Sequence, residues 1–418
     1  GQIYRRQPAA LTRSYRAIYG FEASKARAQH ATFDRLVDQV DYRPGTLAWN
    51  IADNFLYTAK ENLIRKIRYD ALILAPGATD RLLPMKGWTL PGCYSTGAAQ
   101  IALKSQACAI GEKVVFLGTG PLLYLVSYQY MRAGIDVVAV LDTSPFSGQL
   151  KASKYLLSRP LMFAKGLYYR AWLLARRIPV YTGVTPLELE GGDKVRAVRF
   201  RDSDSTEPRI DCDAVGMGFH LRSETQLADL ARCDFTFDEE LGQWCPQTDQ
   251  DGRLSVRGIY AAGDGARILG ADAAEISGEL AALSALSDLG LPISAQRIAT
   301  LRRRRRRMET FRRGLSIAFP WPADLARSVA DEVLLCRCEA ITAGELRRAA
   351  DEQSAPELNR VKALTRVGMG RCQGRFCGSA AAEVLADARH ERVPTVGRLR
   401  GQAPVKPLPM GSVREALE

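Results

Sequence analysis

The sequence is poor in histidine and in long apolar runs. Three histidines, His30, His220 and His390, occur among 418 residues, and none belongs to a recognisable acid–base constellation. No run reaches about 18 uninterrupted apolar residues, and the first residues, GQIYRRQPAA, have no hydrophobic stretch of the signal-peptide kind. These absences predict a cytoplasmic protein without a transmembrane segment, in which any membrane association is made through partners.

Cysteine is scarce as well, with nine in the chain. That number is too small for a disulfide scaffold in a chain of this length, and no Cys-x-x-Cys redox pair occurs. Four of the nine cluster near the C-terminus, which indicates a metal site in a reducing compartment. The other five, which are scattered and predicted to be packing residues, are Cys93, Cys108, Cys212, Cys233 and Cys245.

What the sequence does contain is apolar residues and basic charge. The apolar content of 46% suffices for the cores of two or three domains. Lysine and arginine number 58 against 46 acidic residues, an excess of 12 that suits an acidic partner, an anionic membrane face or nucleic acid. Six arginines run consecutively from Arg302 to Arg307, but interleaved aromatic residues and a nucleic-acid recognition fold are absent. A solvated arm or a partner-docking helix is therefore expected here, and no nucleic acid partner.

The segment Lys113 to Asp142, KVVFLGTGPLLYLVSYQYMRAGIDVVAVLD, predicts a strand, a glycine turn, a helix from about Pro121 to Arg132, and a second strand. Gly118 and Gly120 would let a pyrophosphate approach the backbone, with its charge on free N–H groups at the helix N-terminus. Asp142 lies where an acid accepts hydrogen bonds from a ribose. The segment therefore predicts a Rossmann-type nucleotide site.

One position of this segment departs from the nucleotide-binding pattern. Leu123 stands where a third glycine normally lets helix and strand pack closely, so a bound dinucleotide would be displaced or its site partly closed. A βαβ unit that binds nothing remains an alternative. His220, in GMGFHLRSE, is expected either to face the nucleotide or, with better odds, to be a satisfied structural histidine.

Two further stretches carry a family resemblance. Tyr69 to Ala75, YDALILA, is a predicted buried strand that leads through Pro76 to Gly77, and Gly258 to Asp264 reads GIYAAGD. The first stretch continues into LPMKGWTLPG, and together with GIYAAGD this segment resembles the disulfide-reductase-like flavoproteins. The resemblance implies that Asp264, after Gly263, binds a ribityl hydroxyl of FAD, and that Ala75 and Gly77 line the same site. An aspartate in an ordinary turn is the alternative.

The resemblance also implies a domain order, in which an inserted nucleotide domain splits the FAD domain. The expected boundaries are 1–110 and 209–290 for the FAD domain, 111–208 for the insert, 291–330 for a basic arm and linker, 331–390 for a cluster domain and 391–418 for a tail. Gly1 and Gln2 resemble the segment after the second strand of the first FAD βαβ unit. About forty residues of that unit are expected to be missing, from the record or by real truncation.

The clustered cysteines form two close pairs, Cys336 with Cys338 and Cys372 with Cys377. Four soft thiolates suit zinc or an iron–sulfur cluster. The first pair is separated by one residue and the second by four. This spacing resembles that of the [2Fe-2S] domain related to bacterioferritin-associated ferredoxin. The surrounding LLCRCEAITAGEL and LTRVGMGRCQGRFCG resemble the cluster domain in the α subunits of opine oxidase, hydrogen cyanide synthase and hydroxyproline dehydrogenase. Structural zinc and unligated thiols remain alternatives.

Together these resemblances imply an α/β protein with two Rossmann-like domains, the FAD domain lacking its first unit, and a small helical [2Fe-2S] domain. Its cofactors would be FAD and the cluster, with room for an adenine nucleotide at the second Rossmann site and an FMN at a subunit interface. It would be an oxidoreductase subunit for CH–NH or CH–NH2 donors, of the dye-linked, opine oxidase type.

In such enzymes a β subunit similar to amino-acid oxidases oxidises the carbon–nitrogen bond, and this chain would pass the electrons to an acceptor or the respiratory chain. Opine-like secondary amines are the favoured substrates, with glycine, as in hydrogen cyanide synthase, or a cyclic imino acid as alternatives. Two other functions stay open. One is a stand-alone NAD(P)H-dependent reductase, which Asp142 favours and Leu123 opposes. The other is a truncated, non-catalytic scaffold subunit.

Overall fold

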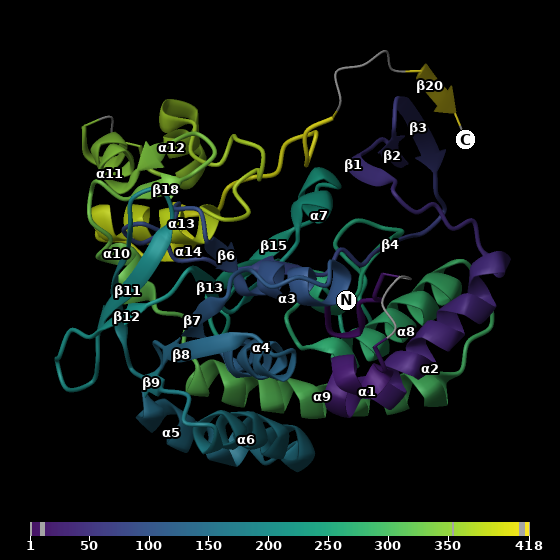
Figure 1. Ribbon diagram of the computed structural model, residues 1–418. Coiled ribbons are helices and arrows are strands. Elements are labelled where there is room, and N and C mark those ends of the chain that lie inside the picture. The colour runs from purple at the N-terminus through teal and green to yellow at the C-terminus, as the bar shows by residue number, and fades with distance from the viewer. Residues whose placement is uncertain (1, 9–12, 353–354, 409–413, 418) are drawn as a thin grey trace. The chain divides into compact units, whose positions relative to one another are not determined.

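The computed structural model describes residues 2–8, 13–352, 355–408 and 414–417 of the chain (Figure 1). They form two compact units, each built from three segments. The first unit comprises Gly1–Tyr42, Asp80–His220 and Arg313–Leu334, and the second comprises Arg43–Thr79, Leu221–Arg312 and Leu335–Glu418.

A five-stranded parallel sheet is the centre of the first unit. Its order is β6 (Cys93–Ser95), β13 (Ala214–Phe219), β7 (Lys113–Thr119), β8 (Asp136–Asp142) and β9 (Val180–Thr182). The apolar run of β7 is fully buried, as its lack of alternation predicts. Helix α4 (Pro121–Arg132) connects β7 to β8 and has the predicted bounds. The βαβ unit predicted from the sequence is thus confirmed.

Helices pack on this sheet through one continuous core. Side chains of α3 (Thr96–Ser105), α4 and α6 (Pro160–Ala175) meet those of β7 and β8 there. The aromatic-rich, basic sequence from Lys151 to Arg177 predicts a single long helix, and this prediction is wrong. The segment forms two helices, α5 (Phe146–Leu156) and α6, because Pro160 has no N–H to donate and starts a new helix instead. Figure 1 shows α5 and α6 side by side below α4.

The rest of the first unit holds helices before the sheet and a small antiparallel sheet. The mixed polar and apolar sequence from Ser14 to Val40 does not clearly predict a helix, yet the segment is mostly helical, with α1 (Tyr15–Tyr19) and α2 (Ala23–Leu36). Strands β10 (Thr185–Gly191), β11 (Val195–Arg201) and β12 (Arg209–Asp211) pair antiparallel. The sequence from Val195 to Phe200 predicts a strand, and β11 confirms it.

In the second unit, β4 (Leu72–Leu74) pairs in parallel with β17 (Ile259–Ala261), so the two apolar motifs of the sequence lie next to each other. The sequence from Ala271 to Leu289 predicts a helix, and α8 (Ala271–Asp288) confirms it. The sequence from Phe55 to Arg68 predicts a strand pair, which β2 (Phe55–Lys60) and β3 (Leu63–Arg68) confirm. Strands β1 (Leu47–Ala52) and β20 (Arg414–Leu417) extend the same sheet.

The arginine-rich stretch forms part of helix α9 (Ala295–Ala318). Leu301 is fully buried and Met308 nearly so, in a core shared with α8. Arg302 donates to both carboxylate oxygens of the nearly buried Asp251, at 2.8 and 2.5 Å. The stretch is therefore not a free arm, because apolar residues at helical spacing anchor the helix to the second unit, while Arg303, Arg304, Arg306 and Arg307 stay exposed. The alternative of a partner-docking helix stays a prediction.

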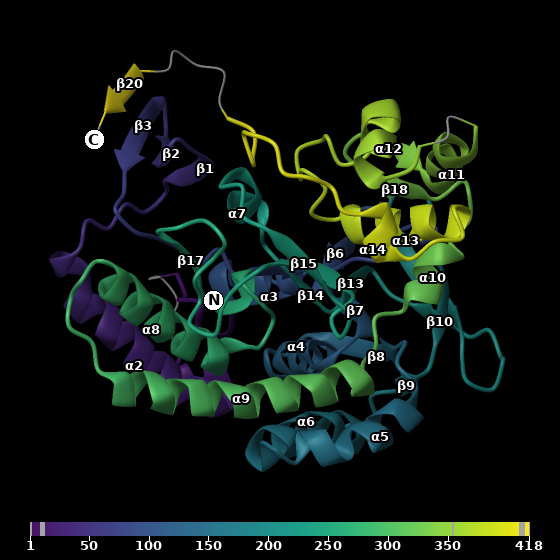
Figure 2. The ribbon, with the colours of Figure 1, turned by 180° about the vertical axis from the view of Figure 1, so that it is seen from behind.

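The C-terminal part of the second unit is small and helical. Figure 2 shows α11 (Ala343–Asp351), α12 (Leu358–Thr365), α13 (Gly378–Ala388) and α14 (Val393–Val396) gathered together. A capping box fixes the start of α11, where Thr342 and Glu345 bond each other's backbone N–H groups.

The remaining short elements are the strands β5 (Ala78–Asp80), β14 (Leu221–Ser223), β15 (Phe235–Asp238), β16 (Gln243–Pro246), β18 (Leu334–Cys336) and β19 (Ile341–Thr342), the helices α7 (Gln226–Leu230) and α10 (Ala323–Arg327), and the 3-10 turns η1 (Gln2–Tyr4), η2 (Gly20–Glu22), η3 (Val37–Gln39) and η4 (Gly263–Gly265). None of the helices in the described ranges is both long and apolar enough to cross a bilayer.

Candidate functional site

The first candidate site lies at the carboxyl ends of β4 and β17, where ligands of open α/β sheets bind. The loops after the two strands approach closely there. A Cβ on Gly265 would lie only 2.8 Å from Cδ of Pro76, and Gly77 and Gly263 both have positive φ. Ala75, Gly77, Gly263 and Asp264, four of the residues predicted to bind FAD, thus belong to this pair of loops.

Asp264 also shapes its own loop. Its Oδ1 accepts hydrogen bonds from the backbone N–H groups of Leu269 and Gly270, at 3.0 and 2.9 Å. A hydrogen bond from a ribityl hydroxyl would then be accepted by Oδ2 of Asp264. Of the other two residues predicted to bind a cofactor at this site, Gly1 lies outside the described residues, and Gln2 begins η1 of the first unit.

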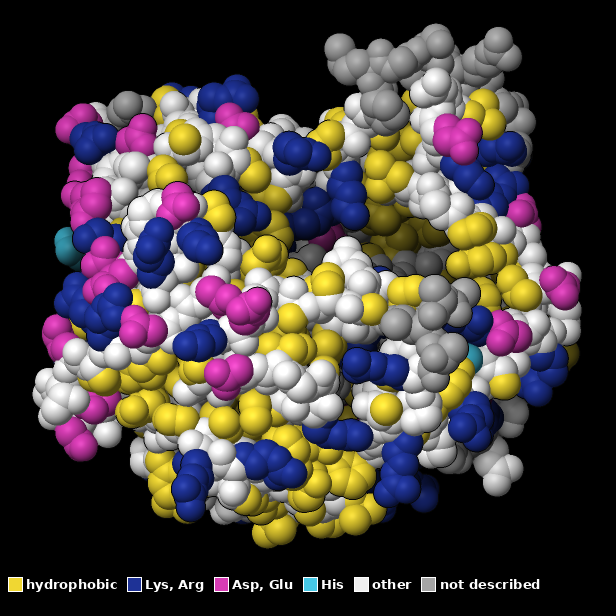
Figure 3. Space-filling view, in the orientation of Figure 1, with side chains coloured by type: hydrophobic (Ala, Val, Ile, Leu, Met, Phe, Trp, Pro, Cys, Tyr) yellow, Lys and Arg dark blue, Asp and Glu magenta, His cyan; other side chains and the backbone are white. Residues whose placement is uncertain are grey.

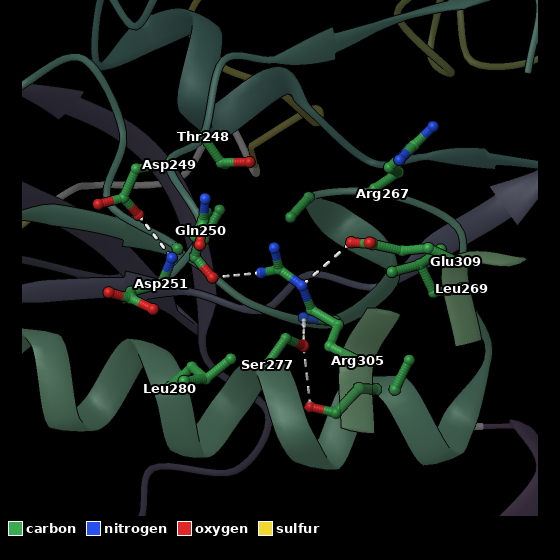
Figure 4. Close-up of a pocket in the computed structure, with 16 residues that line it drawn as sticks. Thr248, Asp249, Gln250, Asp251, Arg267, Leu269, Ser277, Leu280, Arg305 and Glu309 are labelled. Atoms are coloured by element: carbon green, nitrogen blue, oxygen red, sulfur yellow. Dashed lines mark hydrogen bonds and ion pairs between the residues drawn. The ribbon is translucent and has the colours of Figure 1, made fainter. Parts of the chain in front are cut away.

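A cavity of about 210 Å³ adjoins the same loops and includes Gly263 in its wall. In Figure 4 the guanidinium of Arg305 lies between the carbonyl oxygen of Gln250 and the carboxylate of Glu309, at 2.5 and 3.1 Å. Arg302 lowers the pKa of Asp251, another wall residue. Sequence reasoning missed Arg305 because the arginine run was interpreted by its charge alone, without the helical spacing that directs individual arginines inward.

In the first unit, the glycine turn after β7 is closely packed by the protein itself. A Cβ on Gly118 would lie 1.8 Å from the carbonyl oxygen of Gly218 on the neighbouring strand, so glycine is required there for strand packing alone. Nδ1 of His220 would lie 3.4 Å from a Cβ on Gly120. The other ring nitrogen of His220 hydrogen-bonds the carbonyl oxygen of Phe319, which fits the structural role considered for this histidine.

Asp142, the residue predicted to bind a ribose, is fully buried. The hydroxyl of Tyr124 donates to its Oδ2 at 2.6 Å, and the backbone N–H and hydroxyl of Ser144 donate to its Oδ1. Burial raises the pKa of Asp142 to about 6. Leu123, the residue that replaces the third glycine, is buried in the sheet core beside Tyr124. The carboxylate is thus occupied by the protein's own donors.

Replacing Asp142 by Asn is expected to change the pH dependence of stability. Because burial raises the pKa of Asp142 from 3.8 to about 6, the folded chain binds this proton more tightly than the unfolded chain does. The resulting stabilisation, about 3 kcal/mol, is complete below about pH 4 and is lost as the pH rises through about 6. Urea unfolding of both proteins across this range measures it. A wild-type-minus-variant difference that does not vary with pH would contradict the assignment.

The second candidate site consists of the four clustered thiols, all in the second unit. Cys336, at the end of β18, and Cys372 both hydrogen-bond the thiol of Cys377, and Cys372 also contacts Cys338. The Cys377 bond lowers the pKa of Cys336 to about 6 and that of Cys372 to about 5, while the pKa of Cys377 itself rises. The thiols thus form a connected row, and each is free of a disulfide.

Backbone N–H groups surround this row of thiols, which agrees with the glycines that lie close to the cysteines in the sequence. Those of Gly368, Glu339 and Cys338 donate to Cys336, and those of Phe376 and Gly374 donate to Cys372. A Cβ on Gly370 would lie 2.2 Å from Cβ of Cys338, so only glycine allows this approach. N–H donors aimed at sulfur stabilise thiolates, the form that ligates iron.

The arrangement fits a cluster better than a single ion. In the part of the chain that the structure describes, no group of three or more His, Cys, Asp and Glu side chains is arranged to hold a metal ion. Structural zinc needs four ligands that converge on one point. Four thiols in a row, with N–H donors at Cys336 and Cys372, instead suit a group with two irons, each of which takes two thiolates.

Three side chains from residues 222–226 hold the loop between Cys372 and Cys377. Nη1 of Arg222 donates to the carbonyl oxygens of Gly374 and Arg375, at 3.2 and 3.1 Å. Nε2 of Gln226 donates to the carbonyl oxygen of Gln373 at 2.6 Å, and Glu224 pairs with the Arg375 guanidinium at 2.5 Å. Burial lowers the pKa of Arg222. Sequence reasoning missed these residues because more than 140 positions separate them from the loop they hold.

Comparison with known proteins identifies the larger part of the chain. Residues 10–280 match the model of the pyridine nucleotide-disulphide oxidoreductases. The chain belongs to this family. Residues 334–387 match the BFD-like [2Fe-2S] binding domain, inside the expected cluster domain. The resemblance inferred from the motifs is confirmed, and so is the mixed α/β fold with a C-terminal helical cluster domain.

Curated relatives of this oxidoreductase cover nearly its whole length. An opine oxidase subunit from Rhizobium meliloti is 34% identical, over 99% of this chain and 80% of the relative. The HcnB subunit of hydrogen cyanide synthase from Pseudomonas aeruginosa is 32% identical, over 84% of this chain and 76% of the relative. The crystal structure of L-proline dehydrogenase from P. horikoshii shares the fold, with a TM-score of 0.66 at 17% identity over 98% of this chain and 71% of that chain.

These findings establish a flavin and iron–sulfur oxidoreductase. Its cofactors are FAD and a [2Fe-2S] cluster. The chemistry of the two candidate sites agrees with them: paired loops at the carboxyl ends of parallel strands suit a dinucleotide, and a row of thiols under N–H donors suits the cluster.

Proposed function

We propose that this chain is the electron-transferring subunit of a heteromeric dehydrogenase that oxidises a carbon–nitrogen bond, with the substrate site on a partner similar to amino-acid oxidases. The observation that carries the proposal is the pairing of a flavoprotein core with four contacting thiols in a chain whose three histidines form no acid–base constellation. The names of the relatives, which are subunits of opine oxidase and of hydrogen cyanide synthase, support a multi-subunit enzyme.

In this proposal the residues of the chain bind and tune rather than perform acid–base chemistry. Cys336, Cys338, Cys372 and Cys377 are the proposed cluster ligands, and Ala75, Gly77, Gly263 and Asp264 the proposed contacts of FAD. When bound, the cluster transfers single electrons and the flavin can exchange pairs. N–H donors at Cys336 and Cys372 stabilise the thiolates, and the half-buried Arg222 adds positive charge beside them.

Opine-like secondary amines are the substrates that we favour. The opine oxidase relatives support this class, with identities of 33 to 35%, and glycine or a cyclic imino acid are the alternatives. The electrons would pass on to an acceptor or to the respiratory chain.

Co-expression with an amino-acid-oxidase-like partner is expected to produce dye-linked dehydrogenase activity that the isolated chain lacks. The reason is that none of the three histidines belongs to an acid–base constellation that could take the proton released when a C–N bond is oxidised. Reduction of a dye by opines, glycine and proline would be measured with the chain alone, the partner alone and both together. Equal turnover by the isolated chain would contradict the proposal.

The same preparations test the NAD(P)H reductase alternative. The buried, fully engaged Asp142 and the His220 side chain facing Gly120 oppose a nicotinamide nucleotide at the insert. Anaerobic titration with NADH is therefore expected to leave the flavin oxidised or to reduce it slowly. Rapid, stoichiometric bleaching would instead favour the reductase, and purified protein without flavin absorption would favour the scaffold.

A further inference from the structure

The surface of α5 and α6 combines exposed apolar side chains with charge of a single sign. From Thr143 to Leu187 the chain has seven lysines and arginines and no acidic residue. Leu161 is 82% exposed, Leu150 62% and Leu157 60%. The exposed large apolar residues of this surface, which we call the α5–α6 surface, are Phe146, Leu150, Leu157, Leu161, Leu167, Tyr168 and Leu174.

Helix α6 is apolar on both of its faces. Leu173 is buried in the sheet core, and Tyr169 and Trp172 pack against the same core. The opposite face repeats at helical spacing through Leu161, Ala164 and Tyr168 and on to Ala171 and Ala175, all of them exposed. A helix that is apolar all round is normally covered on all sides. Since α6 is covered on one side, the exposed stripe predicts an apolar environment for the other.

Cations border this stripe and no anion interrupts it. Lys151 and Lys154 of α5 are exposed on one side, and Arg176 and Arg177 are exposed at the end of α6. Lys165 is the cation within α6 that is neutralised, by Glu22. Figure 3 shows apolar side chains gathered at the lower edge of the molecule, where Figure 1 places α6, with basic side chains around them.

This pattern matches a lipid surface better than a protein partner. A protein interface has hydrogen-bonding groups that fix its register, whereas the exposed positions of α6 carry one, the Tyr168 hydroxyl. Leucines and an aromatic ring bordered by lysine and arginine are what an interfacial element presents to acyl chains and anionic headgroups. Because α6 is shorter than a spanning helix and held in the sheet core, it would lie in the interface plane.

We infer that the α5–α6 surface docks the protein reversibly on anionic lipid bilayers. Apolar side chains around Leu161 enter the headgroup boundary, and Lys151, Lys154, Arg176 and Arg177 contact the anionic headgroups. This inference is independent of the substrate and of the partner subunit, because it uses no residue of the two cofactor sites.

Vesicle sedimentation with the full chain tests the inference. The protein is expected to bind phosphatidylglycerol-containing vesicles, to bind pure phosphatidylcholine vesicles at least about tenfold more weakly, and to be released by high salt. The double variant Leu161→Glu/Leu167→Glu should lose about tenfold or more in partitioning. Leu291→Glu is the matched control, since Leu291 is 50% exposed in the second unit and Leu167 is 54% exposed.

A second double variant distinguishes loss of lipid binding from loss of folding. Lys151→Gln/Lys154→Gln changes two exposed side chains without adding charge to the apolar stripe, and it should weaken vesicle binding about tenfold while unfolding in urea as the wild type does. Binding that is equal for both vesicle types and unchanged in both double variants would overturn the inference. So would loss of partner-subunit binding in the leucine variant with vesicle binding intact, which would assign the surface to a protein interface.

Discussion

Purified Cys372→Ser protein is expected to contain no [2Fe-2S] cluster, whereas the wild type contains about two irons and two labile sulfides per chain. Cys372 contacts both Cys377 and Cys338, so its replacement interrupts the row of thiols at its middle. A serine hydroxyl is a harder, more weakly acidic ligand than the thiolate it would replace. Iron and sulfide analysis and the visible absorption spectrum measure the loss.

Cys108→Ser is the matched control for this prediction. Cys108 is exposed, belongs to the first unit and lies among the scattered cysteines, so its replacement should leave iron, sulfide and absorption unchanged. The FAD content should stay at the wild-type level in both variants, because the predicted FAD loops share no residue with the thiol row. One equivalent of zinc in the wild type, without visible absorption, would refute the assignment of a [2Fe-2S] cluster to these cysteines.

Arg222→Met is expected to lower the reduction potential of the cluster. Reduction adds negative charge, and a guanidinium held in a partly buried position beside the Cys372–Cys377 loop stabilises that charge. Removing it should shift the midpoint potential downward on the order of 50 mV, equivalent to about 1 kcal/mol for one electron. A redox titration followed by electron paramagnetic resonance measures the shift without any turnover.

Arg222→Lys separates charge from loop geometry. Lysine keeps the positive charge but cannot reproduce both guanidinium contacts to the Gly374 and Arg375 carbonyl oxygens. If charge sets the potential, the lysine variant should recover most of the shift, and Gln226→Ala, which releases only the Gln373 carbonyl oxygen, should show little of it. A potential that is unchanged in Arg222→Met, with the cluster retained, would assign Arg222 a purely structural role.

Local sequence patterns predicted much of the fold because strand burial and ligand spacing depend on residues that are close together in the sequence. The apolar run Val114 to Leu117 has no alternation because its strand is buried on both faces, and Gly120 follows where the backbone turns into α4. The spacing of the four cysteines reports a ligand set that is formed largely within one small domain. Such features depend on residues that are close together in the sequence, so they can be predicted from the sequence alone.

The sequence also misled where a long-range contact decides. Arg302 to Arg307 suggested a solvated arm, but Leu301 and Met308 on the same helix are buried, and Asp251 pairs with Arg302 from about fifty residues away. Which arginines turn inward depends on the surface that the helix meets. Composition and charge do not predict which surface the helix packs against.

By itself, the sequence determined the parallel βαβ unit, the family and the row of cluster thiols, since each depends on residue types at short, regular spacings. Tertiary structure alone decided what the polar groups meet. It brought Tyr124 onto Asp142, His220 beside Gly120, and Arg222 onto the cluster loop. The physical reason is that a hydrogen bond requires donor and acceptor within about 3.2 Å, and the chain brings distant residues to that distance only when its cores pack.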